Sequence, residues 1–242
     1  MSNEKKSHLP SFVFFACLSA FLLFIMLVGY YLWQIAYGDR DALTQEFRSN
    51  KFTKITNATE TEPHTTVDIA PFLRSHNPAL GQKDAPITIV AFIDFECPFC
   101  RESYPIFTDM SKTYAPVIRV VFKHLPITVL HTSALSAANA AACAHEQKKF
   151  WAYYDRLFQE QTLEETALIA HAGNVGLNTS QFTACLRDAK YQSNIEEDIL
   201  DAQRLGIRGT PTYIVNGKKV EGVVPRDAWD TILTQALRDT SL

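Results

Sequence analysis

The chain lacks, or has little of, several sequence features that would point directly to a class of function. Its 242 residues carry 23 Lys and Arg against 26 Asp and Glu, a formal net charge of −3. There is thus no basic excess of the kind that binds nucleic acid, and we expect no nucleic-acid partner. The sequence also lacks internal repeats and low-complexity tracts. Cysteine is scarce, with five in all, so the place of each one is informative.

Charge is absent from one long apolar run near the start of the chain. Residues 12–33 contain no Asp, Glu, Lys or Arg, and as a helix they are long enough to cross a hydrocarbon core of about 30 Å. Lys5 and Lys6 precede the run and acidic residues follow it, which predicts an N-terminus in the cytoplasm. A cleaved signal peptide is the alternative, because Ala36-Tyr37-Gly38 weakly matches a cleavage site.

The run divides the chain into four predicted parts. They are a cytoplasmic tail at 1–11, a transmembrane signal anchor at 12–37, a juxtamembrane linker at 38–76 and a globular domain at 77–242. The anchor would contact membrane lipid through residues 12–37. The linker is predicted because residues 50–66 are polar and lack apolar periodicity.

The most informative motif is Cys97-Pro98-Phe99-Cys100, which follows an apolar β-branched run and precedes a predicted helix. A thiol at a helix N-terminus meets unpaired N–H groups and the positive end of the helix dipole, which lower its pKa. We therefore expect Cys97 to be the nucleophile and Cys100, one turn later, to be the resolving thiol. A structural zinc half-site is the alternative, but no second CxxC or close histidine pair follows, so no metal site is expected.

Three cysteines remain after this pair is assigned. Cys17 lies within the apolar run and is given no chemistry. In an oxidising compartment, Cys143 and Cys185 are then candidates for a structural disulfide. Two unpaired buried thiols are the alternative.

The order of predicted elements is strand, helix, strand, several helices, hairpin and helix. The strands are expected at 87–94 and 117–122, the helices between about 132 and 205, and the hairpin at 212–221 around Asn216-Gly217. Capping boxes at Thr162 with Glu165 and at Asn178 with Gln181 predict two helix starts. This order predicts an α/β, thioredoxin-like fold with a helical insertion at about 130–206, preceded by a single N-terminal transmembrane helix.

Four segments occur in order between residues 78 and 237: residues 94–100, Lys123-His124-Leu125-Pro126, residues 142–151 and Gly209-Thr210-Pro211-Thr212. Together they resemble the DsbA family of thiol-disulfide oxidoreductases, in its BdbD-like branch. The resemblance implies a cis peptide bond between Thr210 and Pro211 beside the dithiol, where an extended substrate segment pairs with the backbone. An ordinary trans turn is the alternative.

The resemblance implies an enzyme that introduces disulfides into unfolded or reduced exported proteins, without a cofactor. The domain would face the periplasm from the bacterial inner membrane, and a DsbB-like quinone-linked membrane oxidase would reoxidise it. A disulfide isomerase or reductase, kept reduced by a membrane reductase, is the first alternative. A non-catalytic envelope module that binds peptides is the second.

The sequence departs from the family at two positions. Phe99 stands where many relatives have a histidine, and Ala91 stands where they often have a buried glutamate. Asp94 is therefore a possible proton relay, or alternatively a cap for nearby N–H groups. Glu96 is expected to be a solvated charge at the rim. His124 and His131 have no metal-ligand spacing, and we expect surface or satisfied core roles for them.

Overall fold

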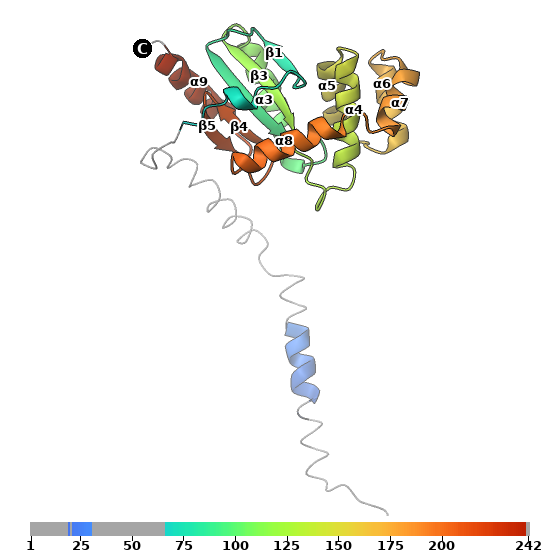
Figure 1. The fold of residues 1–242 in the computed structure, drawn as a ribbon. Helices are drawn as coiled ribbons and strands as arrows, with labels where there is room; N and C mark the ends of the chain where they lie inside the picture. The colour runs from blue at the N-terminus through green and yellow to red at the C-terminus, as the bar shows by residue number, and fades with distance from the viewer. Residues whose placement is uncertain (1–18, 20, 31–65, 241–242) are drawn as a thin grey trace, which may run out of the picture. The chain divides into compact units, whose positions relative to one another are not determined.

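The computed structural model describes residues 19, 21–30 and 66–240. Residues 21–30 are helical. Across these described ranges, no helix is both long and apolar enough to cross a membrane. The predicted tail, most of the predicted anchor at 12–37 and most of the linker lie outside the described residues. The chain divides into two units, residues 1–63 and 64–242, and the elements labelled in Figure 1 belong to the second.

A five-stranded mixed sheet forms the centre of the second unit, in the order β1-β3-β2-β4-β5 (Figure 1). Its strands are β1 (Ala79–Gly81), β2 (Ile87–Ile93), β3 (Ile118–His124), β4 (Thr212–Val215) and β5 (Lys218–Glu221). Strands β2 and β3 are parallel, whereas the other three neighbouring pairs are antiparallel. The predicted strands and hairpin are confirmed. Strand β1 was missed because its three exposed residues carry no alternating pattern.

The described part of this unit has seven α-helices: α3 (Pro98–Thr113), α4 (Ala134–Glu146), α5 (Phe150–Glu160), α6 (Glu165–Asn174), α7 (Thr179–Arg187), α8 (Gln192–Arg204) and α9 (Arg226–Thr240). A short 3-10 helix, η1 (Ala70–Phe72), precedes them. Helices α4 to α7 gather to one side of the sheet, and α8 returns from them along it (Figure 1). They form the predicted helical insertion, so the thioredoxin-like α/β fold is confirmed.

The sheet is covered on both faces. Helices α3 and α9 bring Phe107 and Trp229 onto one face, where both rings pack against Tyr213 of β4. On the other face, Val90 and Phe92 pack with a second cluster that includes Ala202 of α8. Successive side chains of a strand point to opposite faces, so a strand covered on both sides is apolar throughout.

The two predicted capping boxes have different outcomes. The side chain of Asn178 accepts a hydrogen bond from the N–H of Gln181 at 3.0 Å, so the predicted start of α7 is confirmed. The box at Thr162 is wrong. The hydroxyl of Thr162 instead lies 3.0 Å from the His171 ring, and Glu164 takes the N-cap position without a side-chain cap.

The folded unit begins earlier than the predicted boundary at residue 77. Val67 donates its N–H to the carbonyl of Gly217 at 3.0 Å. Ile69 and Leu73 pack against the second apolar cluster. The predicted linker at 38–76 is therefore too long at its C-terminal end, because these residues complete one face of the sheet.

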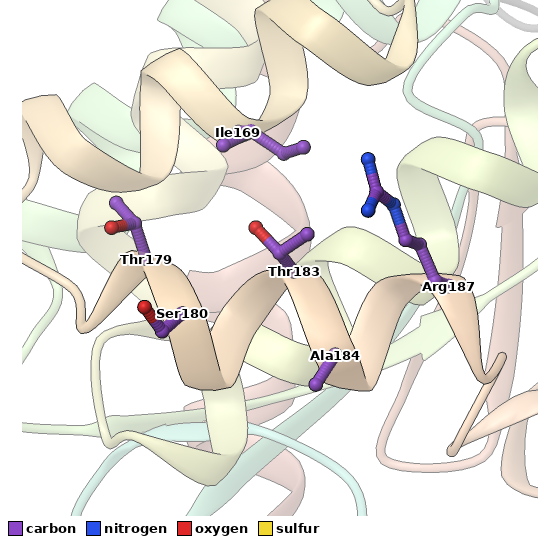
Figure 2. A pocket seen from close by; sticks show the side chains of 6 residues that line it. All are labelled: Ile169, Thr179, Ser180, Thr183, Ala184 and Arg187. Atoms are coloured by element: carbon purple, nitrogen blue, oxygen red, sulfur yellow. The ribbon is translucent and has the colours of Figure 1, made fainter.

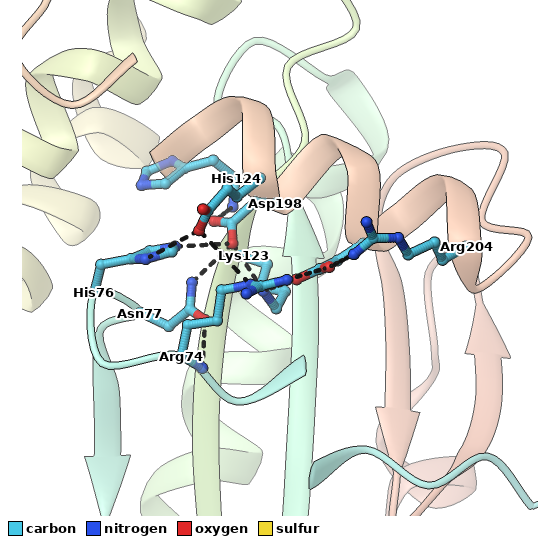
Figure 3. Close-up of polar contacts among 9 residues, drawn as sticks. Arg74, His76, Asn77, Lys123, His124, Asp198 and Arg204 are labelled. Atoms are coloured by element: carbon cyan, nitrogen blue, oxygen red, sulfur yellow. Dashed lines mark hydrogen bonds and ion pairs between the residues drawn. The ribbon is translucent and has the colours of Figure 1, made fainter. Parts of the chain in front are cut away.

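A buried ion network ties β3 to α8 (Figure 3). The Nζ of Lys123 lies 2.8 Å from Oδ1 of Asp198 and 2.9 Å from Oδ2 of Asp201, and none of the three side chains is exposed. Arg74 adds a contact of 2.8 Å to Asp201, and the backbone N–H of His124 donates to Asp198 at 3.0 Å. Nothing in the local sequence pattern predicts this network.

The network keeps both carboxylates ionised. Burial raises the pKa of Asp198, but the hydrogen bond to His76 and the charge of Lys123 outweigh burial and hold this pKa below its ordinary value. Burial likewise raises the pKa of Asp201, and its bonds to Arg74 and Lys123 lower it by more. Removing the lysine would therefore leave two buried anions short of a partner.

We expect Lys123→Met to lower the free energy of unfolding at neutral pH by about 3 kcal/mol, the cost of breaking a buried ion pair. Both aspartates have depressed folded pKa values, so their stabilisation is present above the unfolded pKa and is lost as the pH falls through the folded pKa. The deficit should thus shrink in acid. Urea titrations of wild type and Lys123→Met at neutral pH and in acid measure the difference in the free energy of unfolding. Lys190→Met, which removes the exposed partner of Glu146, is the control and should change stability little. Equal stability of Lys123→Met and wild type at neutral pH would contradict the prediction.

Candidate active site

Cys97 and Cys100 lie where β2 passes into α3. Cys97 is the N-cap residue with extended backbone, and Pro98 takes the first helical position, where its missing N–H is not needed. The N–H of Cys97 donates to the carbonyl of Asp94 at 3.3 Å, which turns the chain from strand to helix. Both cysteines are free thiols and are only 4% and 2% exposed.

The thiol of Cys97 is strongly acidified. A hydrogen bond from Cys100 is the largest of the effects that lower the pKa of Cys97 to about 6, and burial opposes it. The side chain of Thr210 and the backbone N–H groups of Cys100 and Phe99 lower this pKa further. Those N–H groups belong to the first helical turn, where they have no partner within the helix. At neutral pH Cys97 is therefore mainly a thiolate.

Cys100 has the opposite character. Burial raises the pKa of Cys100 well above its ordinary value, and the hydrogen bond and charge of Cys97 raise it further. The pair thus consists of one thiolate and one thiol, with a single proton held mainly on the buried sulfur. This asymmetry suits a nucleophile and its resolving partner.

The loop before β4 lies against Cys97. The peptide bond between Thr210 and Pro211 is cis, and the carbonyl of Thr210 lies 3.3 Å from Sγ of Cys97. Strand β4 pairs antiparallel with β2, with Thr212 opposite Phe92. This register brings the start of β4 to the same edge of the sheet as the end of β2.

Asp94, at the end of β2, is buried and fully bonded. Its Oδ1 accepts from the N–H of Glu96 at 2.9 Å, and its Oδ2 accepts from the N–H of Ile127 at 2.8 Å. The same Oδ2 lies 2.7 Å from Nδ1 of His131. Asp94 therefore caps nearby N–H groups, one of the two roles left open by the sequence, and also holds a histidine that the sequence analysis did not connect to this site.

The expectation that Glu96 is a solvated rim charge is wrong. Glu96 is half-buried, and its Oε2 accepts from the N–H of Ser133 at 2.6 Å. Ser133 is the N-cap of α4. A carboxylate is favourable at the positive end of a helix dipole, which explains why Glu96 turns inward.

The remaining predicted residues occupy two separate places. Pro98 and Phe99 are exposed beside the thiols, with Phe99 50% exposed. Cys143 and Cys185 form a disulfide that joins α4 to α7 within the helical insertion. The structure therefore brings Cys97, Cys100, Asp94 and the Thr210-Pro211 loop together, but leaves the disulfide outside the site.

His131 was missed because its spacing was tested only against metal-ligand patterns. It lies 37 residues from Asp94 in sequence. The available signal was its position soon after β3, because two parallel strands end at the same edge of a sheet. Within the described part of the chain, no group of three or more His, Cys, Asp and Glu side chains is arranged to hold a metal ion.

An open hollow lies between α6 and α7 (Figure 2). Its lining consists of Ile169, Thr179, Ser180, Thr183, Ala184 and Arg187. All six residues belong to α6 and α7, whereas the thiols lie at the start of α3 and the Thr210-Pro211 loop precedes β4, and Arg187 is already paired with Glu165 at 2.9 Å. We assign this hollow no part in the thiol chemistry.

We expect the alkylation rate of reduced Cys97 to reach half its maximum near pH 6. Cys100→Ala should raise the pKa of Cys97, because it removes the hydrogen bond that contributes most to the shift. The ultraviolet absorbance of the thiolate, followed against pH, measures both values. Ser111→Ala removes a buried hydroxyl from the same helix and should leave the Cys97 pKa unchanged. A Cys97 pKa that stays the same without Cys100 would contradict the assignment.

Comparisons with known proteins agree with this fold. The family model described as thioredoxin matches residues 74–235. A thioredoxin-like oxidoreductase from Silicibacter pomeroyi is 28% identical, with a TM-score of 0.64 over 71% of this chain and 98% of that chain. Oxidised BdbD from Bacillus subtilis is 23% identical and has a TM-score of 0.62, over 67% of this chain and 94% of its own, which bears on the fold alone.

Among curated proteins, Na(+)/H(+) antiporter NhaA 1 of Salinispora arenicola is 34% identical over 163 residues, 67% of this chain. The match covers 25% of that antiporter, so the chain spans about a quarter of the length of the curated relatives it matches. The family resemblance inferred from the four sequence segments is confirmed by the family match and the shared fold. The chain belongs to the thioredoxin family.

Proposed function

We propose that this chain is a protein thiol-disulfide oxidoreductase that introduces disulfides into exported proteins through Cys97 and Cys100. The observation that carries the proposal is the asymmetry of the pair, with the pKa of Cys97 lowered to about 6 and that of Cys100 raised. A thiolate of low pKa is a good leaving group and stabilises the reduced enzyme. Both effects favour oxidation of the substrate.

The reaction is two successive thiol exchanges. A substrate thiolate attacks Sγ of Cys97 in the oxidised enzyme, the bond to Cys100 breaks, and Cys100 leaves and takes up a proton. A second substrate thiolate then attacks the substrate sulfur of the mixed disulfide and displaces Cys97 as a thiolate. The substrate loses two electrons and gains a disulfide, while the enzyme gains the two electrons as its reduced dithiol.

The backbone beside Cys97 offers a way to hold an extended substrate. Thr210 lies next to the reactive sulfur, two residues before β4 begins at Thr212. Pairing of a substrate segment with this backbone would depend little on substrate sequence, because main-chain hydrogen bonds supply the affinity. Such a mode suits many different reduced exported proteins.

Isomerase or reductase activity is the second candidate, and the charges around Cys97 favour it. Phe99 supplies no positive charge beside Cys97, and the carboxylates of Asp94 and Glu96 lie close to the pair. Less stabilisation of the thiolate makes a dithiol more reducing. Such an enzyme would take electrons from a membrane reductase, whereas the proposed oxidase would pass them to a DsbB-like quinone-linked membrane oxidase.

We expect the full-length protein, equilibrated in glutathione buffers, to have a reduction potential closer to the about −120 mV of DsbA than to the about −270 mV of thioredoxin. The oxidised protein should also convert a reduced dithiol peptide to its disulfide, and Cys97→Ser should abolish this. A reduction potential near that of thioredoxin would instead indicate that the protein acts as a reductase. No exchange at all, with Cys97 unreactive at mildly acid pH, would indicate a peptide-binding module.

We also propose that residues 12–37 anchor the chain in the bacterial inner membrane, with residues 1–11 in the cytoplasm. Residues 38–65 would then link the anchor to a domain in the periplasm. The uncharged run at 12–33 and the preceding lysines support this orientation. The disulfide between Cys143 and Cys185 fits an oxidising compartment.

An anchored chain should sediment with membranes after alkaline washing, and protease added to spheroplasts should digest its domain from the periplasmic side. A matched control replaces residues 1–37 with a cleavable signal peptide and should release a soluble periplasmic domain. If the natural chain were recovered as a soluble protein shortened near Ala36 to Gly38, the N-terminal segment would be a cleaved signal peptide and not an anchor.

A further inference from the structure

The charges around Cys97 do not by themselves favour a thiolate. Asp94 and Glu96 lie one to three residues before Cys97, and both carboxylates turn toward the loop after β3. Negative charges close to a thiol disfavour its ionised form. Within the CPFC motif, Phe99 offers no positive charge to compensate.

His131 is the basic side chain that meets these carboxylates. Its Nδ1 lies 2.7 Å from Oδ2 of Asp94, and the side chain is only 15% exposed. The loop that carries the ring is held by three hydrogen bonds from its backbone N–H groups. Asp94 accepts from the N–H of Ile127, Glu96 accepts from the N–H of Ser133, and the N–H of His131 donates to the carbonyl of Ile127 at 3.0 Å.

The charge state of His131 is coupled to Cys97. Burial lowers the pKa of His131, but the hydrogen bond and charge of Asp94 and the charges of Cys97 and Glu96 together raise it above its ordinary value. An interaction by which the Cys97 thiolate favours the imidazolium must also act in reverse, because coupling free energies are reciprocal. The imidazolium therefore favours the thiolate.

We propose that His131, held by Asp94, is a positioning residue whose imidazolium stabilises the thiolate of Cys97 and so makes the enzyme more oxidising. The proposal rests on the function proposed above for Cys97 and Cys100, and it names the residue that biases the direction of exchange. No proton passes between the two groups. His131 offsets the negative charges of Asp94 and Glu96 where Phe99 does not.

The effect depends on both pH and redox state. The stabilisation of the thiolate is present while His131 is protonated, and it is lost as the pH rises through the pKa of His131. In the oxidised enzyme Cys97 carries no charge, so one of the groups that raise this pKa is absent. His131 should therefore titrate at a lower pH in the oxidised enzyme than in the reduced enzyme.

The decisive experiment follows the ring signal of His131 by NMR against pH in both redox states of the full-length protein. It also measures the Cys97 pKa and the glutathione equilibrium in wild type, His131→Gln and Asp94→Asn. We expect a higher His131 pKa in the reduced protein. His131→Gln should show a raised Cys97 pKa, with threefold to tenfold less thiolate than wild type at a fixed pH, roughly the effect of one nearby charge.

Asp94→Asn separates charge from position, because it removes an anion near Cys97 together with the group that keeps His131 protonated. The Cys97 pKa should therefore change less in Asp94→Asn than in His131→Gln. His145→Gln, at a half-buried histidine of α4 with no bond to either carboxylate, is the matched control and should leave the Cys97 pKa and the glutathione equilibrium unchanged.

Equal His131 pKa values in the two redox states, or an unchanged Cys97 pKa in folded His131→Gln, would overturn this inference while leaving the oxidase proposal intact. Failure of the wild type to oxidise a reduced peptide would instead remove the proposed function. If His131→Gln does not fold, the titration of the wild type in its two redox states still decides the question.

Discussion

The position of β2 within the sheet is the constraint on which the site depends. The strand lies between β3 and β4 and is covered on both faces. Because β3 runs parallel to β2, the loops after both strands leave from the same edge, and antiparallel β4 begins at that edge. Three loops distant in sequence therefore meet there, and they carry Cys97, His131 and Thr210. The reactive pair results from a local motif, but its surroundings result from this strand order.

The second face of the sheet contains a buried positive charge. Lys123 points from β3 toward α8 and is fully buried, so its charge needs partners within the protein. Asp198 and Asp201, one turn apart on α8, provide them. Burial lowers the pKa of the neighbouring His124 to about 4, so this ring stays neutral, and the backbone N–H of His124 donates to Asp198. The network thus fixes the end of β3 just before the loop that carries His131.

The chemistry of the dithiol reflects a balance of opposing effects at one helix end. Burial disfavours any charge on Cys97, and negative charges close to a thiol, here the carboxylates of Asp94 and Glu96, act in the same direction. The proton of Cys100 and the N–H groups of the first turn of α3 act against them and prevail. The fold contributes by holding both carboxylates in bonds to the loop at 127–133, so that part of their charge is directed away from the sulfur.

The sequence alone determined what depends on neighbours along the chain. The dithiol at a helix start, strands β2 and β3, the Asn216-Gly217 hairpin turn and the family resemblance all follow from local pattern, because backbone conformation and helix-end electrostatics act over a few residues. The pairing of Lys123 with Asp198 and of Asp94 with His131 was decided only by tertiary structure. These partners are 75 and 37 residues apart. Their meeting depends on strand register and on the docking of α8, which local periodicity does not encode. For the same reason Glu96, which has the local pattern of a solvated charge, is turned inward by the start of α4.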